Sequence, residues 1–594
     1  NLSAMSAVFA SPKASTKNRI KSAMELTDVR RLTGPNFLLD RAGACAEIIG
    51  VDADVTAVLP KLTRQLSSIA ADVGWGHETI KSRLYPGGGS IAITAPIDAL
   101  YAATSLIEAA WDFENGHVSD KGARIKELKT EIAEECNPGV LTMRAAAEKH
   151  GKAFLSDDDD VSVGLGQGRR IWAVDDLPDP DDVDWDAVSN IPVALVTGTN
   201  GKSTTVRLAS AIASKAERMA ASSSSDYVRV GPTVLDTGDY SGPGGARMAL
   251  RSARADMAIL ETARGGLMRR GLPITNIEAC LITNISVDHL GEYGITDVEM
   301  LADAKFMLAK AVSKTGRLIL NRDDPALVQR AEGFSGNISW FGLSIDEAFA
   351  SECAARGQAV AYVKDGEMVL SSEGETVSIL PIADFPIAMG GAAKFNIANG
   401  LAAIALTDAL GLDAASMRAG LGTFESTPEN NPGRGNFMTV GGVNVLLDFA
   451  HNPHGVAALA EAIKDMPAPR KLFLLGQAGD RSDSDIIDIT KAVCSADPDM
   501  IIVKELPRAL RGRQPGAVSR IINKALGDIG VPREKIMQAD NEFEATQKAL
   551  EWAQSGDFLG LLVYVERARV LAYLQQLMDT GWECGDPLPA ETAL

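Results

Sequence analysis

The sequence lacks any pair of closely spaced cysteines. Its six cysteines are scattered over 594 residues without a CxxC pair. This spacing excludes the usual zinc ribbon and disulfide framework and indicates reduced thiols. No apolar run approaches the roughly 18 residues that a membrane-spanning helix needs. The first residues, NLSAMSAVFASPKAS, contain no initiator methionine and no apolar signal-peptide core. We therefore expect a cytoplasmic protein that makes no membrane contact.

Positive charge is also scarce. The chain holds 58 lysines and arginines against 78 aspartates and glutamates, a formal net charge of −20. Such a chain repels phosphate backbones and anionic lipids, so we expect no nucleic-acid partner. With 46% hydrophobic and 23% charged residues, the composition is that of an ordinary globular protein. The length predicts roughly three or four domains.

One acidic stretch divides the chain. DDLPDPDDVDWD, at 175–186, combines aspartate and proline, which predicts a solvated linker with nothing to pack. Before it, a strand is expected at 90–97 and a helix at 98–111. The predicted domains are an N-terminal α+β domain at 1–170, the linker at 171–190, a central domain at 191–430 and a C-terminal domain at 431–594.

After the linker, short apolar runs alternate with helical patterns. IPVALVTG enters a glycine turn, and the following TTVRLASAIASKA has helical periodicity. Further strands are expected at 255–261, 278–285 and 316–321, and the alternation resumes after Asn436. This pattern predicts an α/β fold, with a parallel sheet in the central domain and a smaller, Rossmann-like sheet in the C-terminal domain.

The segment GTNGKST, at 198–204, is a candidate phosphate-binding loop. A predicted strand precedes it and a predicted helix follows, so its backbone N–H groups can face an anion at the helix start. Lys202 would reach the β- and γ-phosphates, and Ser203 or Thr204 would hold Mg²⁺. The alternative is a glycine-rich turn with an incidental lysine. We predict ATP and Mg²⁺ binding, with nucleotide contacts from Gly198, Thr199, Asn200, Gly201, Lys202, Ser203 and Thr204.

The motifs and their order resemble a known family. The loop GTNGKST resembles the signature of the Mur ligases and folylpolyglutamate synthases, which join a carboxylate to an amine with ATP. Longer stretches resemble the Mur-type domain of cyanophycin synthetases, namely TGDYSGPGGARMALRSARADMAILETARGGLMRRGL (237–272), NISVDHLGEYGI (284–295) and VKELPRALRGR (503–513). The N-terminal DVRRLTGPNF (28–37) and VGLGQGRR (163–170) resemble the beginning of the same enzymes. Only the acidic linker separates VGLGQGRR from the loop, so we expect their ATP-grasp domain to be absent here.

The resemblance implies a metal site beside the loop. Glu261 and His289 match metal ligands of the family, and they would hold Mg²⁺ together with Ser203. On chemistry alone a histidine is an unusual ligand for Mg²⁺, which prefers oxygen. The alternatives are a strand-end surface charge at Glu261 and a polar helix start at His289. The resemblance makes Lys202, Glu261 and His289 catalytic residues.

Lys305 is a fourth candidate catalytic residue. It lies where many family members carry a carbamylated lysine, a modification that turns the ammonium into an anion able to bridge a second Mg²⁺. The sequence leaves open the commoner outcome, which is a solvated lysine on a helix.

Further motifs imply contacts to the nucleotide and the substrates. NRDDP, at 321–325, matches a strand-end motif near the nucleotide, and the counterparts of Asn396 and Asn399 face adenine. The ordinary role for Asn396 is to cap a helix. Arg434 can clamp phosphate oxygens, and Asp448 would contact the ribose or orient a hinge. The implied substrate contacts are Arg264, His451, Asn452, Asp480 and Arg481.

The predicted function is an ATP-dependent ligase that joins an amino acid to a carboxylate through an acyl-phosphate. Closure about residues 425–436 would complete the site and exclude water. The resemblance implies arginine as the amine and an aspartyl peptide as the acid, and we expect a homo-oligomer.

Three alternatives stay open. The first is a ligase for a cell-wall, folate-like or natural-product acid, and the second is a non-catalytic nucleotide-binding partner of a separate ATP-grasp enzyme or synthetase. The third is a mechanical P-loop NTPase, which has no use for the motifs PGR (432–434) and AHNP (450–453).

Overall fold

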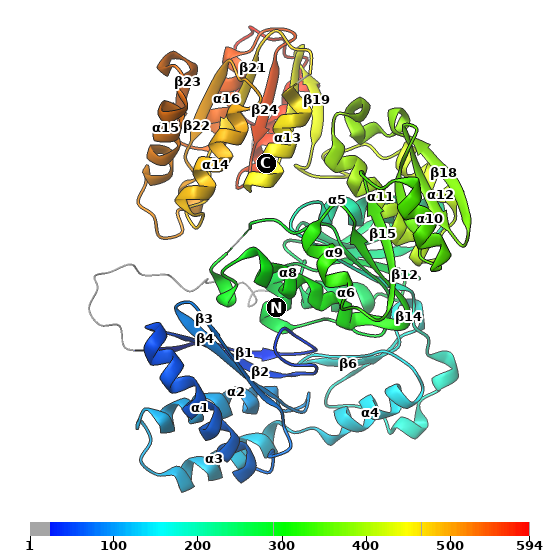
Figure 1. The fold of residues 1–594 in the computed structure, drawn as a ribbon, viewed down its shortest axis with the longest axis vertical. Helices are drawn as coiled ribbons and strands as arrows, with labels where there is room; N and C mark the ends of the chain where they lie inside the picture. Colours follow the sequence, from blue (N-terminus) through cyan, green and yellow to red (C-terminus); the bar gives the residue numbers. More distant parts are fainter. Residues whose placement is uncertain (1–23, 289, 465, 593–594) are drawn as a thin grey trace. The chain divides into compact units, whose positions relative to one another are not determined.

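The computed structural model describes residues 24–288, 290–464 and 466–592. The chain forms two compact units, one over residues 24–424 and the other over residues 425–592 (Figure 1). None of the helices in these ranges is long and apolar enough to cross a membrane.

The first unit begins with an antiparallel sheet whose strand order is β1-β2-β4-β3. Alternate residues of β2 face opposite ways. Ala44, Ala46 and Ile48 pack on helices α1 and α2, whereas Cys45 and Glu47 lie on the other face. The helices cover one face only, so the second face is left for another part of the unit. The elements are β1 Glu25–Leu32, β2 Gly43–Ile49, α1 Asp52–Asp72, β3 Ile80–Tyr85, β4 Gly88–Thr94, α2 Leu100–Glu114 and α3 Lys121–Glu135.

A small layer follows, made of α4 (Pro138–Lys149) and the antiparallel sheet β5-β6-β7 (Phe154–Ser156, Asp160–Val163, Arg170–Ala173). The acidic segment 175–186 packs on it, so the prediction of a solvated stretch with nothing to pack is wrong. Val183 is buried beside β6, and the Trp185 ring stacks on His150 at 4.7 Å. Apolar residues spaced between the aspartates supply this packing.

An 11-stranded sheet forms the centre of the first unit, in the order β11-β10-β9-β12-β8-β13-β14-β15-β16-β17-β18. Strands β9, β12, β8, β13, β14, β15 and β16 run parallel, and antiparallel strands extend both ends. The strands are β8 Val193–Thr197, β9 Ala220–Ser223, β10 Tyr227–Val230, β11 Thr233–Thr237, β12 Met257–Glu261, β13 Ile277–Ile282, β14 Val312–Asn321, β15 Asn337–Gly342, β16 Val360–Lys364, β17 Glu367–Ser372 and β18 Glu375–Pro381.

Helices cover both faces of this sheet. In β8, Val193 and Leu195 belong to one hydrophobic cluster, and Ala194 and Val196 belong to the other. Strands buried on both faces explain the continuous apolar runs of the sequence. The helices on the first face are α6 Pro243–Leu250, α7 Arg264–Arg270, α9 Pro325–Ala331 and α10 Glu347–Ala355; those on the second are α5 Lys202–Lys215, α11 Lys394–Ala409 and α12 Ala414–Gly422. Helix α8 (Val298–Phe306) lies beside α7 and α9.

The second unit is a smaller α/β sandwich with strand order β19-β20-β24-β21-β22-β23. All neighbouring strands except β19 and β20 are parallel. The strands are β19 Asn436–Val440, β20 Val443–Asp448, β21 Lys471–Leu475, β22 Met500–Lys504, β23 Ile536–Ala539 and β24 Phe558–Leu562. The helices are α13 Pro453–Lys464, α14 Asp483–Cys494, α15 Ala517–Ile529, α16 Glu542–Trp552 and α17 Arg567–Asp579, of which α16 and α17 share a core with the sheet.

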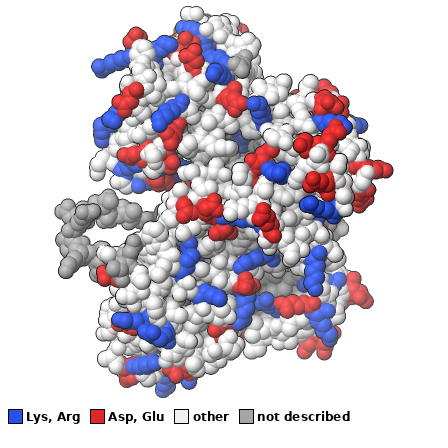
Figure 2. All heavy atoms as spheres, viewed as in Figure 1, with Lys and Arg blue, Asp and Glu red and all other residues white. Residues whose placement is uncertain are grey.

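These elements confirm the predicted α/β class and the α+β character of the N-terminal region. All six cysteines are free thiols, as their spacing predicted. On the face shown in Figure 2, acidic and basic side chains are interspersed, so the negative net charge does not gather there in one patch.

Candidate active site

The predicted phosphate loop is a tight turn between β8 and α5. Gly198 has φ +143° and Gly201 has φ +84°, which are conformations that favour glycine. A Cβ at Gly198 would lie 1.8 Å from Thr283 Oγ1, and one at Gly201 would lie 2.2 Å from Asn399 Oδ1. Both glycines are therefore required by close approach as well as by backbone conformation.

A neighbouring segment holds the loop in place. The Thr199 backbone N–H donates to the Asn284 carbonyl at 2.8 Å, and the Asn200 N–H donates to Asn284 Oδ1 at 2.9 Å. Thr283 Oγ1 donates to the Asn200 carbonyl at 2.6 Å. Because β8 and β13 are adjacent parallel strands, their carboxyl ends place these residues together, at the edge where α/β sheets bind ligands.

Lys202 and Ser203 begin helix α5, and their side chains contact different partners. The Lys202 ammonium folds back over the loop and donates to the carbonyls of Gly198 (3.1 Å) and Thr199 (2.9 Å). Ser203 Oγ donates to Glu261 Oε2 at 2.6 Å. Ser203, Thr204 and Glu261 are buried, so the strand-end surface charge considered for Glu261 is wrong.

Lys305, on α8, lies against the phosphate loop. Its side chain is only 2% exposed, and its ammonium donates to Thr199 Oγ1 at 2.7 Å. Burial, and after it the charges of Lys202 and Arg264, hold the pKa of Lys305 well below its ordinary value of 10.5; Asp288 acts in the opposite direction. The alternative of a solvated helix lysine is therefore wrong.

Ser203 and Glu261 fit a magnesium site, because a hydroxyl and a carboxylate oxygen are the ligands that Mg²⁺ prefers. They lie within hydrogen-bond distance of each other at the end of the phosphate loop. His289, the other predicted ligand, lies outside the described residues. Within the described ranges no group of three or more His, Cys, Asp or Glu side chains could hold a metal.

The two predicted adenine-side asparagines are brought together on α11, next to the loop. Asn399 Nδ2 donates to Asn396 Oδ1 at 3.2 Å, and Asn396 Nδ2 donates to the Ile387 carbonyl at 2.9 Å. Asn396 does not cap the helix, as its ordinary role would require: Ala393 is the N-cap residue. The chain enters the helix earlier than the motif suggests, so Asn396 lies inside the first turn.

Two other motifs support the site. Arg264 begins α7, is largely buried and pairs with Glu292. In NRDDP, Asn321 Nδ2 donates to the Thr283 carbonyl at 2.9 Å, and Asp324 caps α9 and accepts the Ile285 N–H. NRDDP therefore holds the segment that in turn holds the phosphate loop.

The remaining candidates lie in the second unit, at the carboxyl end of β20. Burial raises the pKa of Asp448 to about 6, although its bond from the Ala450 N–H (2.6 Å) and the charge of Arg434 oppose the shift. The guanidinium of Arg434 lies 5.5 Å from the Phe449 ring centroid. Asp448 and Arg434 are therefore electrostatically coupled.

The AHNP motif forms the turn into α13. His451 Nδ1 lies 2.9 Å from the Phe449 carbonyl, and Asn452 Oδ1 accepts the Gly455 N–H at 2.8 Å. Asn452 is buried, which indicates that it shapes this turn. His454 is exposed. In the next loop Asp480 pairs with Arg511 at 2.6 Å, and Arg481 is buried.

Sequence reasoning missed Tyr564, which links these loops. Its hydroxyl donates to the Ala450 carbonyl at 2.9 Å and accepts from Gln477 Nε2 at 3.0 Å. Its ring lies 4.4 Å from the ammonium of Lys504. The position after strand β24, at the carboxyl end of a parallel sheet, was the signal that could have found it.

A buried ion pair fixes Tyr564. Lys504 donates to Glu542 at 2.6 Å with both side chains at most 1% exposed. Glu542 also accepts the backbone N–H groups of Tyr564, Val565 and Glu566. Burial alone would raise the pKa of Glu542, but Lys504 and these N–H groups overcome it and lower the pKa.

Comparison with known proteins finds a matching family model in each of the two units. The Mur ligase middle domain matches residues 196–407, and the Mur ligase glutamate ligase domain matches residues 433–562. A cyanophycin synthetase of Crocosphaera subtropica is 34% identical over 361 residues, which are 61% of this chain and 40% of that protein. The chain thus spans less than half the length of this relative.

The chain also has more distant similarities. A UDP-N-acetylmuramoyl-L-alanyl-D-glutamate–2,6-diaminopimelate ligase of Gloeobacter violaceus is 25% identical over 62% of this chain and 71% of that protein. A MurF crystal structure from Acinetobacter baumannii has a TM-score of 0.47 and 18% identity, covering 66% of this chain and 77% of the other.

Proposed function

We propose that this chain, which belongs to the Mur ligase family through its middle and glutamate ligase domains, is an ATP-dependent ligase that joins an amine to a carboxylate by an amide bond. The observation that carries the proposal is the loop at 198–204, where Ser203 donates to buried Glu261, Lys202 folds over the loop and buried Lys305 contacts Thr199. A mechanical NTPase shares the loop, the serine and the carboxylate, but it has no use for the AHNP and PGR motifs.

The loop would bind the phosphates of ATP. Backbone N–H groups at the start of α5 and the positive end of the helix attract an anion. Lys202, which now contacts two loop carbonyls, would exchange them for phosphate oxygens. Thr283 and Asn284 hold the loop in this conformation.

Ser203 and Glu261 would hold Mg²⁺, and His289 stays a predicted third ligand. The ion supplies charge neutralisation at the phosphate oxygens. The chain's own contribution is to place a hydroxyl and a carboxylate side by side in a buried position. Lys202 adds a positive charge from the other side of the loop.

The chemistry of the proposed ligase has two steps. An acid carboxylate oxygen attacks the γ-phosphorus, and the bond to ADP breaks. The amine then attacks the acyl carbon, loses one proton and displaces phosphate. Excluding water protects the acyl-phosphate between the steps, and we propose that closure of the two units about residues 425–436 does this.

Lys305 is proposed to act as a carbamate. A lysine reacts with CO₂ only as the neutral amine, and the lowered pKa of Lys305 favours that form. The resulting anion would lie beside Thr199 of the loop. The neutral amine and the carbamate are both compatible with the buried position, and mass spectrometry under CO₂ distinguishes them.

The substrates are proposed from the relatives. Arginine and an aspartyl peptide are the first pair to test, with Arg264, His451, Asn452, Asp480 and Arg481 as substrate contacts. Adenine would lie against Asn396 and Asn399, with Arg434 and Asp448 nearby on closure. The absence of an ATP-grasp domain, a separate ATP-grasp partner and a homo-oligomeric state all stay predictions, as does a cytoplasmic location.

The test is phosphate release from ATP and Mg²⁺ with each amino acid singly, with and without aspartyl peptides and other acids, and with mass spectrometry of the product. We expect turnover that needs one amine and one acid. Lys202→Ala should lower kcat by about 10²- to 10³-fold, because it removes a charge that stabilises the transition state.

The matched control is Lys215→Ala, which removes an exposed lysine from the last turn of the same helix. It should keep full activity. Nucleotide binding without turnover for any pair of substrates would contradict the ligase and favour the non-catalytic partner subunit. Turnover with a cell-wall or natural-product acid alone would keep the ligase and replace the acid.

A further inference from the structure

The motif DVRRLTGPNF has a place in the structure that its resemblance did not explain. The end of β1 and the residues after it run along the carboxyl end of α7. The Thr33 N–H donates to the Arg270 carbonyl at 2.8 Å, and the Leu272 N–H donates to the Pro35 carbonyl at 2.7 Å. A Cβ at Gly34 would lie 2.3 Å from the Leu272 carbonyl oxygen. This motif and the carboxyl end of α7 thus form one interface.

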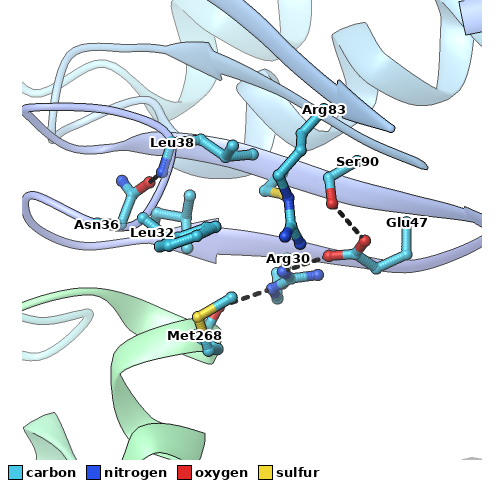
Figure 3. A pocket seen from close by; sticks show the side chains of 10 residues that line it. Arg30, Leu32, Asn36, Leu38, Glu47, Arg83, Ser90 and Met268 are labelled. Carbon is cyan, nitrogen blue, oxygen red and sulfur yellow. Dashed lines mark hydrogen bonds and ion pairs between the residues drawn. The ribbon is translucent and has the colours of Figure 1, made fainter. Parts of the chain in front are cut away.

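Arg30 is the central contact of this interface. It lies on the face of the N-terminal sheet opposite α1 and α2, between Glu47 of β2 and Met268 of α7 (Figure 3). Its guanidinium donates to Glu47 Oε1 at 2.7 Å and to the Met268 carbonyl at 3.1 Å. Ser90 and Tyr85 donate to the other oxygen of Glu47, so the buried charge is fully bonded.

Arg83, on β3, reaches a different part of the central domain. Its two terminal nitrogens donate to the carbonyls of Tyr293 (2.7 Å) and Gly294 (3.2 Å). The Tyr85 ring covers Gly294 so closely that a Cβ there would lie 2.2 Å from it. An arginine presents its donors in a rigid fork that suits two adjacent carbonyls, whereas a lysine has no such fixed geometry.

The turn that Arg83 holds is strained. Tyr293 has φ +53° and ψ +30°, a left-handed conformation that is unfavourable for a tyrosine. Such a conformation persists where surrounding contacts impose it. Here these are the Arg83 bonds, Arg269 Nε at the Tyr293 hydroxyl and Arg30, whose guanidinium lies 5.1 Å from the Tyr293 ring centroid.

Helix α7 and the turn at 291–295, which the N-terminal domain contacts, both adjoin residues of the candidate active site. Helix α7 begins at Arg264, which pairs with Glu292 of the turn. The turn follows the segment that carries Asp288, and the charge of Asp288 acts on Lys305. A shift of the turn would therefore move Glu292, the partner of Arg264, and disturb the segment that carries Asp288.

We infer that Arg30 and Arg83 are positioning residues for the ligase site, through which the N-terminal domain holds α7 and the turn at 291–295 in the arrangement needed for the reaction. The inference rests on the proposed function for its effect on turnover. The restraint that Arg83 places on the turn can be measured without turnover.

The test is Arg83→Ala in the full chain, because removing Arg30 would leave the buried Glu47 unpaired. Hydrogen exchange should become faster at 286–296, while the affinity for ADP stays unchanged, since no loop residue is altered. In the ligase assay kcat should fall about tenfold or more, because small misplacements slow positioned reactions strongly. Arg83→Lys should restore only part of this loss.

The matched control is Lys310→Met. Lys310 joins the same two domains, donating to the Asn36 carbonyl at 3.0 Å and to Asp40 at 2.7 Å, but does not contact the turn. It should leave kcat and the exchange at 286–296 unchanged.

Three results would overturn the inference: unchanged exchange at 286–296 in Arg83→Ala, unchanged kcat despite faster exchange, or an equal loss of kcat in Lys310→Met. If the wild-type chain shows no turnover, the proposed function fails. Exchange and ADP affinity then still decide whether Arg83 holds the turn.

Discussion

At the scale of single residues, burial changes what a side chain can do. Lys305 would be an ordinary cation on an exposed helix face, but here it lies against the phosphate loop with almost no solvent contact. Glu261 shows the same effect, because its burial beside Ser203 turns a strand-end carboxylate into a potential metal ligand. Residue type alone predicts neither environment.

The burial of Lys305 predicts a specific pH dependence of stability. The unfolded chain keeps a proton on this amine up to about pH 10.5, whereas the folded protein releases it well below that pH. Since the unfolded state then binds more protons, the free energy of unfolding should rise with pH in this window, by at most about 1.4 kcal/mol per pH unit.

Lys305→Met should remove this contribution. We expect the free energy of unfolding of the variant minus that of the wild type to fall as the pH rises from 7 to 9. Denaturant unfolding at each pH measures both values. Parallel curves over this range would contradict the lowered pKa. The variant should also lose turnover in the ligase assay.

At the scale of elements, the loops after parallel strands carry the candidate residues in both units. In the second unit, the turn after β20, the loop after β21 and the end of β24 meet at the Tyr564 hydroxyl. The Lys504–Glu542 pair holds the backbone from which Tyr564 projects. Three loops are thus tied to one side chain.

Tyr564→Phe should loosen these loops while its ring keeps its packing. We expect a loss of about 1–2 kcal/mol in local stability and a fall in kcat/KM for the amine, measured by hydrogen exchange at 448–455 and steady-state kinetics. The control is Tyr573→Phe, whose buried hydroxyl donates to the Pro589 carbonyl at 2.9 Å away from the loops. An equal fall in kcat/KM in the control would contradict a positioning role for Tyr564.

At the scale of the whole molecule, the candidate residues are divided between two units. Residues 24–424 contain the phosphate loop, Glu261 and Lys305. Residues 425–592 contain Arg434, Asp448 and the loops that carry His451 and Asp480. We therefore expect the units to come together at some stage of the proposed reaction. The segment 425–436 is the connection about which we expect this movement.

Closure predicts a change that solution scattering can detect. With a non-hydrolysable ATP analogue and both substrates, the radius of gyration should fall. Lys202→Ala, which weakens phosphate binding, should reduce or abolish the change at the same ligand concentrations. An unchanged radius in the wild-type chain, at concentrations shown to saturate both sites, would contradict closure about residues 425–436.

The sequence by itself predicted the fold class, several strands and the turn of the phosphate loop. Apolar runs predicted strands such as β8, β12 and β20, because strands buried on both faces must be apolar throughout. Glycines at 198 and 201 predicted a phosphate loop, since short-range backbone conformation is encoded locally. The packing of the acidic segment 175–186 was not predicted, because its few apolar residues find their partners in α4 and β6, which are distant from it in the local pattern.

Only the tertiary structure decided which distant residues meet. Three contacts show this: Lys305 with Thr199, Arg83 with the Tyr293 carbonyl, and Tyr564 with Gln477 and Ala450. The residues that they join are 87 to 210 positions apart in the sequence. Local sequence patterns determine backbone conformation, whereas burial and charge coupling depend on how strands are ordered and which faces they cover. The sequence therefore specified the parts of the candidate site, and the sheet topology specified their environment.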